Sequence, residues 1–168
     1  MSPGAPERRI LGLDPGSLVT GWGVIGVSGS QLHALDSGVI RPDRKASLAK
    51  RLCQLHEGIG GIIAAARPDE AAIEEVYVAR NARSALVLGH ARGVIMLACI
   101  EHGLEPHEYS ANTVKQAVLG SGGGGASKER VAFMVKALLG LERIPEPDDI
   151  TDALACAICH ANRREVPG

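Results

Sequence analysis

Aromatic side chains are scarce in this chain of 168 residues, which contains one tryptophan, two tyrosines and one phenylalanine. Domains that read single strands on rows of stacked rings need more of them, so this class of nucleic-acid reader is disfavoured. A strong net charge is also absent, since the formal value is −1. No global positive field therefore draws the chain onto nucleic acid, although local basic patches remain allowed.

Long apolar runs are missing as well. The longest, residues 94–100, is far short of the ~20 residues that cross a bilayer. Residues 1–7 have neither the apolar core nor the cleavage pattern of a signal peptide. We therefore expect a soluble cytoplasmic protein with no membrane partner. The four cysteines then indicate reduced thiols and not a disulfide framework.

The length and the apolar content of 45% indicate one globular domain. We expect a disordered N-terminal tail over residues 1–8 and a single domain over residues 9–164. Apolar periodicity and turn residues predict strands at 10–14, 22–27, 32–40, 71–76 and 107–109. They predict helices at 47–66 and 84–102, then one from the cap Ser110 to Leu119, one from the cap Ser127 to about Gly140, and one opening at Pro147. This order predicts an α/β fold in which a mixed five-stranded sheet has helices on both faces.

Asp14 follows the first apolar strand and precedes Pro15 and Gly16. Asp, Pro and Gly are favoured at successive positions of a tight turn, so a purely structural role explains the motif. The alternative is a site, because open α/β sheets bind ligands at the carboxyl ends of their central strands. Both interpretations stay open on these residues alone.

Glu74 and Glu75 end the strand predicted at 71–76. Strand side chains alternate between faces, so these two cannot both point toward Asp14. Glu74 shares a face with apolar neighbours, where a lone charge is costly without a partner or a metal. The alternative is that both glutamates mark a solvated strand end.

Three aspartates follow Pro147 at the start of the last predicted helix. Acidic residues in a first turn satisfy free N–H groups and the helix dipole, and this explains Asp148. Asp149 and Asp152 are three residues apart and share one helix face. That face continues through Cys156 into an apolar stretch, so it points inward, where a capping role no longer suffices.

Convergence of Asp14, Glu74, Asp149 and Asp152 would create a strongly repulsive cluster. At spacings of ~5 Å and an effective dielectric constant of 20, each pair of carboxylates repels by about 3 kcal/mol. Two divalent ions would balance the four negative charges, and paired ions are the known clamp for in-line phosphodiester hydrolysis. The hypothesis is a nuclease site with two Mg²⁺ or Mn²⁺ ions.

Five motifs in this order resemble the RuvC family of Holliday junction resolvases, which have a ribonuclease H-like fold. They are Leu11-Gly12-Leu13-Asp14-Pro15-Gly16-Ser17 with Thr20-Gly21, Ala72-Ile73-Glu74, Ala91-Arg92-Gly93, Val114-Lys115-Gln116 and Asp149-Ile150-Thr151-Asp152-Ala153-Leu154-Ala155. The similarity runs from about Ile10 to Arg163. Each motif alone is weak, but five in register are specific.

The resemblance implies a function for each acidic candidate. It selects Glu74 over Glu75, and Asp149 with Asp152 over Asp148, as ligands of two ions that activate water and stabilise the leaving 3′ oxygen. It implies a homodimer that nicks a four-way DNA junction symmetrically and leaves 5′-phosphate and 3′-hydroxyl ends. It also implies the RuvA–RuvB branch-migration complex as a partner. The apolar helix predicted at 84–102 is the candidate for the dimer interface.

Two stretches of the chain, residues 76–100 and 109–128, contain no acidic residue. Their basic residues are candidates for phosphate contacts, with chance clustering on a solvated surface as the alternative. The candidates for DNA binding are Arg80, Arg83, Arg92, Lys115 and Lys128. The resemblance places Lys115 and Lys128 near the scissile phosphate, and Tyr77 as a ring that stacks at the opened junction centre, with ordinary packing as its alternative.

One departure from the family pattern, one misleading motif and two rival functions remain to be considered. The loop 120–126 is longer and richer in glycine than the family pattern leads us to expect, so the placement of Lys128 is not predicted. The sequence Cys156-Ala157-Ile158-Cys159-His160 resembles half a metal site, but small core cysteines explain it more simply. The alternative functions are a ribonuclease H-like RNA-processing nuclease and a non-catalytic junction-binding module that does not need the four acids.

Overall fold

A mixed five-stranded sheet with the strand order β3-β2-β1-β4-β5 is the centre of the fold. The structure is a computed structural model that describes residues 7–76, 81–120 and 125–163. The strands are β1 (Arg8–Asp14), β2 (Thr20–Ser28), β3 (Gln31–Ile40), β4 (Glu70–Glu74) and β5 (Pro106–Tyr109). The helices are α1 (Leu48–Ala66), α2 (Ala82–Glu101), α3 (Ala111–Leu119), α4 (Lys128–Leu138) and α5 (Asp148–Arg163).

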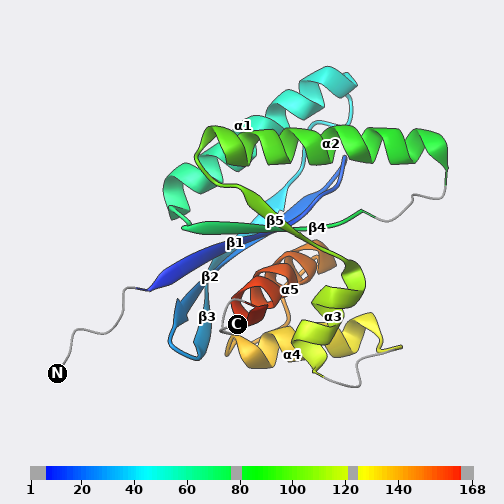
Figure 1. Cartoon of the computed structure of the whole chain (residues 1–168). Helices are drawn as coiled ribbons and strands as arrows, with labels where there is room; N and C mark the ends of the chain where they lie inside the picture. The colour runs from blue at the N-terminus through cyan, green and yellow to red at the C-terminus, as the bar shows by residue number, and fades with distance from the viewer. Residues whose placement is uncertain (1–6, 77–80, 121–124, 164–168) are drawn as a thin grey trace.

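Helices cover both faces of this sheet, as the sequence predicts (Figure 1). The first three strands are antiparallel, and β4 and β5 are parallel to β1. Helices α1 and α2 lie on one face, whereas α3, α4 and α5 lie on the other. Strand β1 is central, and its residues Ile10, Leu11 and Leu13 are fully buried because side chains of both faces meet helices.

The predicted elements are all present, and their boundaries differ by a few residues. The strand predicted at 71–76 is Glu70–Glu74, and the helix predicted at 84–102 begins at Ala82. That helix starts earlier because the Asn81 side chain accepts a hydrogen bond from the Ser84 N–H at 2.9 Å. The predicted caps Ser110 and Ser127 are confirmed.

The predicted tail over residues 1–8 is one correction. Arg8 already belongs to β1, where it pairs with Val27, and its side chain lies 3.6 Å from Glu70. Glu7 is also placed, with a contact of 2.8 Å to His33. The strand therefore begins at Arg8, inside the predicted tail. The charges of Arg8 and Arg9 hide the start of the strand in the sequence. Residues 1–6 lie outside the described part of the chain.

Glycines allow α5 to lie unusually close to the sheet. A Cβ atom at Gly12 of β1 would lie 2.0 Å from the Ala153 carbonyl oxygen. A Cβ at Gly21 of β2 would lie equally close, at 2.0 Å, to the carbonyl oxygen of Asp149. Real side chains do not tolerate such distances, so these positions require glycine. The N-terminal part of α5 is thereby held directly against β1 and β2.

Helix α2 has one buried face and one exposed apolar face. Ala91, Ile95, Ala98 and Cys99 are buried in the cluster that includes residues of α1. On length and composition alone, α2 is also the one helix among the described residues that would suffice to span a bilayer. Helix α2 packs on the sheet of this domain, and most of its residues lie outside the buried core.

Candidate active site

Asp14 is the last residue of β1, at the carboxyl end of the central strand. The loop that follows is fixed by Thr20, whose buried hydroxyl donates to the Gly16 carbonyl at 2.8 Å and accepts from the Gly16 N–H at 3.2 Å. In the sheet, Asp14 is directly opposite Gly21. The Asp-Pro-Gly motif therefore ends the strand and opens a loop that Thr20 holds in place.

Glu74 ends β4 beside Asp14. The parallel register pairs Gly12 with Ala72 and Leu13 with Ile73, which makes Asp14 and Glu74 neighbours on the same face. Gly12 faces α5, so the two carboxylates point to the α5 side as well. Glu75 has its own role in the sheet, since its N–H donates to the Tyr109 carbonyl at 2.8 Å.

Asp149 and Asp152 lie in the first two turns of α5. The close approach at Gly21 brings the backbone of Asp149 against β2, next to the strand end that carries Asp14. Asp148 is exposed, in agreement with the capping role predicted for it.

All four predicted acids line one pocket of about 380 Å³. Its remaining lining residues include Glu75 and Lys128. Helix α5 thus closes a site whose other half is the carboxyl edge of the sheet.

Burial and mutual repulsion raise the pKa values of several of these carboxyl groups. Burial raises the pKa of Asp14 from 3.8 to about 8, and the charges of Asp152, Glu74 and Asp149 add to this effect. Burial is also the main reason that the pKa values of Glu74 and Asp152 are raised. Glu74 belongs to this cluster because its charge is one of those that raise the pKa of Asp14. Mutual repulsion between carboxylates at a poorly solvated position raises pKa values in this way.

These residues fit divalent cations. Four carboxylates are hard oxygen donors of the kind that Mg²⁺ and Mn²⁺ prefer. Within the described residues, no three His, Cys, Asp or Glu side chains form a ready-made cage for a single ion. Magnesium does not need such a cage, since it usually takes one or two carboxylates together with water and substrate phosphate. The raised pKa values reflect burial and an excess of negative charge, and bound cations would compensate this charge.

Lys128 and Lys115 are the two predicted basic residues that act on the acid cluster. Lys128 is the first residue of α4 and lines the pocket. Its charge opposes the rise in the pKa values of Asp14, Glu74 and Asp152. Lys115, on α3, acts in the same sense on Glu74 and Asp152. The structure thus places positive charge on the open side of the site, on elements that flank the glycine loop.

The other predicted DNA contacts are placed differently. Arg83 is exposed in the first turn of α2. Arg92 is partly buried in the middle of α2, with a nitrogen 3.1 Å from a carboxylate oxygen of Glu108, and it does not line the pocket. Tyr77 and Arg80 lie outside the described residues.

The cysteine interpretation agrees with the structure. Cys156 and Cys159 are buried free thiols in the core of α5, and burial raises the pKa of both.

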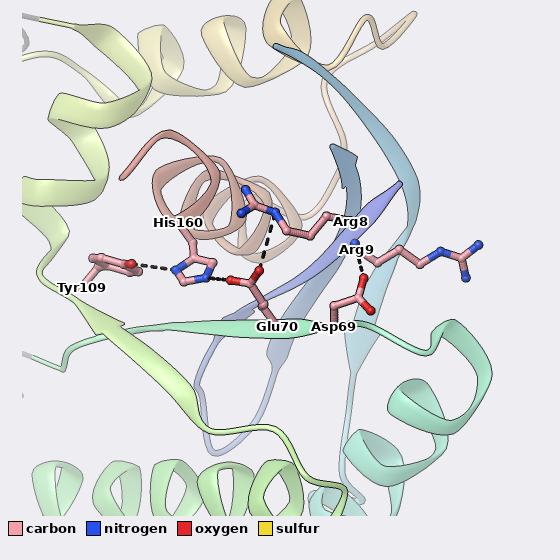
Figure 2. A network of polar contacts seen from close by, with 6 residues as sticks. All are labelled: Arg8, Arg9, Asp69, Glu70, Tyr109 and His160. Carbon is pink, nitrogen blue, oxygen red and sulfur yellow. Dashed lines mark hydrogen bonds and ion pairs between the residues drawn. The ribbon is translucent and has the colours of Figure 1, made fainter. Parts of the chain in front are cut away.

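A histidine to which the sequence analysis assigned no role occupies a buried polar network. His160, which is 1% exposed, contacts Glu70 through Nε2 and the Tyr109 hydroxyl through Nδ1 at 2.7 Å. Figure 2 shows these three side chains, from α5, β4 and β5, pointing toward one another. In the sequence, His160 stands out only as a polar residue on an otherwise apolar helix face. This pattern does not reveal that Glu70 and Tyr109 are its partners.

Comparison with known proteins gives consistent relatives. The family described as crossover junction endodeoxyribonuclease RuvC matches residues 10–160. A protein of that name from Paramagnetospirillum magneticum is 52% identical over 93% of this chain and 92% of its own length. The corresponding values for the protein from Halorhodospira halophila are 47%, 95% and 93%.

Solved structures resemble this fold over nearly the whole chain. The RuvC of Thermus thermophilus, solved in complex with a Holliday junction substrate, superimposes with a TM-score of 0.83 at 30% identity. The alignment covers 94% of each chain. A second structure of the Thermus thermophilus protein gives a TM-score of 0.84 at 33% identity.

Proposed function

Because this chain belongs to the RuvC family of crossover junction endodeoxyribonucleases, and is thus a nuclease with the ribonuclease H-like fold, we propose that it resolves four-way DNA junctions by paired symmetric nicks. The observation that carries the proposal is the convergence of Asp14, Glu74, Asp149 and Asp152 on one pocket with Lys128 at its edge. An RNA-processing nuclease and a non-catalytic junction binder are the competing functions.

The four acids would hold two divalent ions, Mg²⁺ or Mn²⁺. Bound there, the ions would supply an activated water and charge stabilisation for the leaving 3′ oxygen, so that the products carry 5′-phosphate and 3′-hydroxyl ends. Asp14 and Glu74, on adjacent strands, fix one side of the site. Asp149 and Asp152 face them from α5, whose position is set by the glycines of β1 and β2. The rigid sheet edge and the helix orient these donors before substrate arrives.

Lys115 and Lys128 would bring charge to the scissile phosphate. Both lie close enough to the cluster to affect the pKa values of Glu74 and Asp152. A cation beside the pocket stabilises negative charge that develops on the phosphoryl oxygens, and it does so without transferring a proton.

Arg83 and Arg80 would extend the phosphate contacts along the start of α2, and Tyr77 would stack on a base at the junction centre. Arg92 is the weakest member of the predicted set, because Glu108 already neutralises part of its charge.

A homodimer would present two equivalent sites to the two-fold junction, and α2 is the surface for it. Its outer side carries an apolar groove of about 500 Å³ floored by Gly89 and Gly93 and flanked by Leu86 and Leu97. These two leucines are 65% and 52% exposed. A second copy of α2 fits a surface where glycine permits close backbone approach. The partner for branch migration would be the RuvA–RuvB complex.

Replacement of Leu97 by glutamate is expected to convert the dimer into a monomer, because it would bury two unpaired charges in an apolar interface. We expect at least a 100-fold weaker dimerisation constant by sedimentation and single instead of paired nicks on a junction. Leu35→Glu is the control, since Leu35 is a leucine of β3 that is 40% exposed and lies away from α2. If both variants dimerise like the wild type, α2 is not the interface.

The experiment that tests the function is incubation of the wild type with a mobile synthetic four-way junction in Mg²⁺ or Mn²⁺. Linear duplex and single-stranded RNA are incubated in parallel. Paired symmetric nicks that a ligase can seal are the expected result. Junction binding without cleavage in either metal would indicate a recognition module, and cleavage of RNA alone would indicate an RNA-processing nuclease.

A further inference from the structure

We propose that the contact of His160 with Glu70 and Tyr109 is a positioning device that sets the axial register of α5 and thereby aligns Asp152 with Glu74. The proposal rests on the function proposed above for these acids. We call the three side chains the polar clasp. They come from α5, β4 and β5, and Figure 2 shows them on the face of the sheet that α5 covers.

The distance from the clasp to the acids is nearly the same along α5 as along β4. Helix α5 runs antiparallel to β4, so Asp152 lies near Glu74 at one end and His160 contacts Glu70 at the other. Eight helical residues from Asp152 to His160 span about 12 Å. Four strand residues from Glu70 to Glu74 span about 13 Å. The two segments have matched lengths, so closing the clasp at one end brings the two carboxylates level at the other.

The other contacts of α5 differ from the clasp in how sharply they fix the position of the helix along its axis. From Ala153 to Ala161 the buried residues of α5 other than His160 are alanine, leucine, isoleucine and cysteine. Apolar contacts have little directionality. The glycines of the sheet set how closely α5 approaches, with Ala157 packed over Gly12 and Leu154 over Gly23. Cys159 and Asn162 contact carbonyl groups of α3, whereas the clasp ties α5 to the sheet itself. A hydrogen bond tolerates only a few tenths of an ångström, so the clasp is the sharper constraint.

Each polar group of the clasp has a partner within it. His160 Nε2 contacts the Glu70 carboxyl group and Nδ1 contacts the Tyr109 hydroxyl, so both ring nitrogens have a polar partner. The Arg8 Nε atom lies 3.6 Å from Glu70, which connects the start of β1 to the same group. The His107 ring covers His160 with centroids 4.5 Å apart. Three strands and the helix are thus joined at one point.

Tyr109→Phe and Glu70→Gln test the clasp with little risk to folding, because each keeps the shape of its side chain. We expect each variant to raise the Mn²⁺ concentration for half-maximal cleavage at least fivefold and to lower the maximal rate about tenfold. Junction affinity without metal should stay within twofold of the wild type. The matched control is Ile158→Val, a buried change of one methylene in the same helix that leaves the clasp intact.

A second readout does not depend on cleavage. Titration of Mn²⁺ into the free protein, followed by electron paramagnetic resonance, should show at least fivefold weaker binding in the clasp variants and none of this loss in Ile158→Val. Equal effects in all three variants at equal loss of thermal stability would overturn the proposal. If the wild type binds Mn²⁺ but cleaves no junction, the proposed function fails, while the titration still decides on the clasp.

Discussion

Asp14→Asn should abolish junction cleavage and, in metal-free buffer, make the protein more stable. The carboxylate is buried among three other acids, and these surroundings raise its pKa to about 8. Asparagine keeps the size of the side chain and removes the charge that repels its neighbours. Loss of a metal ligand removes several kcal/mol of transition-state stabilisation, so we expect a rate at least about 10³-fold lower.

The stability gain should depend on pH in a defined direction. Between pH 4 and pH 8 the folded protein retains a proton on Asp14 that the unfolded chain has released, because the folded pKa is the higher one. The stability of the wild type therefore falls as pH rises through this window. The variant lacks this slope, so the two stabilities should agree near pH 4 and diverge toward pH 8. We expect a gain on the order of 2 kcal/mol at pH 8, or about 4–8 °C in Tm.

Thermal unfolding in EDTA at several pH values measures this difference. Addition of Mg²⁺ should raise the Tm of the wild type more than that of the variant, since ligands that bind only the folded state stabilise it. Glu75→Gln is the control, because Glu75 lines the same pocket, whereas the charges that raise the pKa of Asp14 are those of Asp152, Glu74 and Asp149. A variant that is inactive but less stable than the wild type at pH 8 would contradict the claim that repulsion among the four carboxylates destabilises the metal-free protein.

Gly21→Ala should reduce the cleavage rate by about 100-fold or more with only partial loss of stability. The added methyl group would lie 2.0 Å from the Asp149 carbonyl oxygen and 2.9 Å from the Asp149 Cβ. Because that contact is with backbone, the start of α5 must move away from β2. A displacement near 1 Å is enough to cost about 100-fold in a positioned site. Overpacking of this kind costs about 1–3 kcal/mol in folding free energy.

The rate at saturating Mg²⁺ and the Tm are the quantities to compare. Gly61→Ala is the matched control, since Gly61 lies in α1 with open space at the Cβ position. There the same change should raise stability by about 0.5–1 kcal/mol and leave cleavage unaltered. Cleavage by Gly21→Ala within threefold of the wild type would show that the close approach of α5 is dispensable for the site.

Local patterns predicted the sheet and the helices well, because each element is amphipathic or bounded by caps and turns. Ser110 and Ser127 mark the starts of their helices, and the apolar run before Asp14 marks the central strand. The predicted tail failed at Arg8, whose charge hides its place in the sheet. The four acids were candidates because a charged group among apolar neighbours at the end of an element is costly without a cation or another partner. Only the resemblance to the RuvC family selected Glu74 over Glu75, and Asp149 with Asp152 over Asp148.

The polar clasp could not be predicted, because its members are 51 and 90 residues apart and no spacing rule connects them. The ion pair of Arg92 could not be predicted either, because its partner Glu108 comes from β5, which folds beside α2.

Helix α5 is the last element of the fold, and it has a consequence for the timing of synthesis. Strand β1 is synthesised before the helix and carries one acid, whereas Asp149 and Asp152 are made only after the other described elements. The site therefore cannot exist on a nascent or C-terminally truncated chain. A chain that stops before residue 149 lacks two of the four acids, and we expect it to be inert toward DNA.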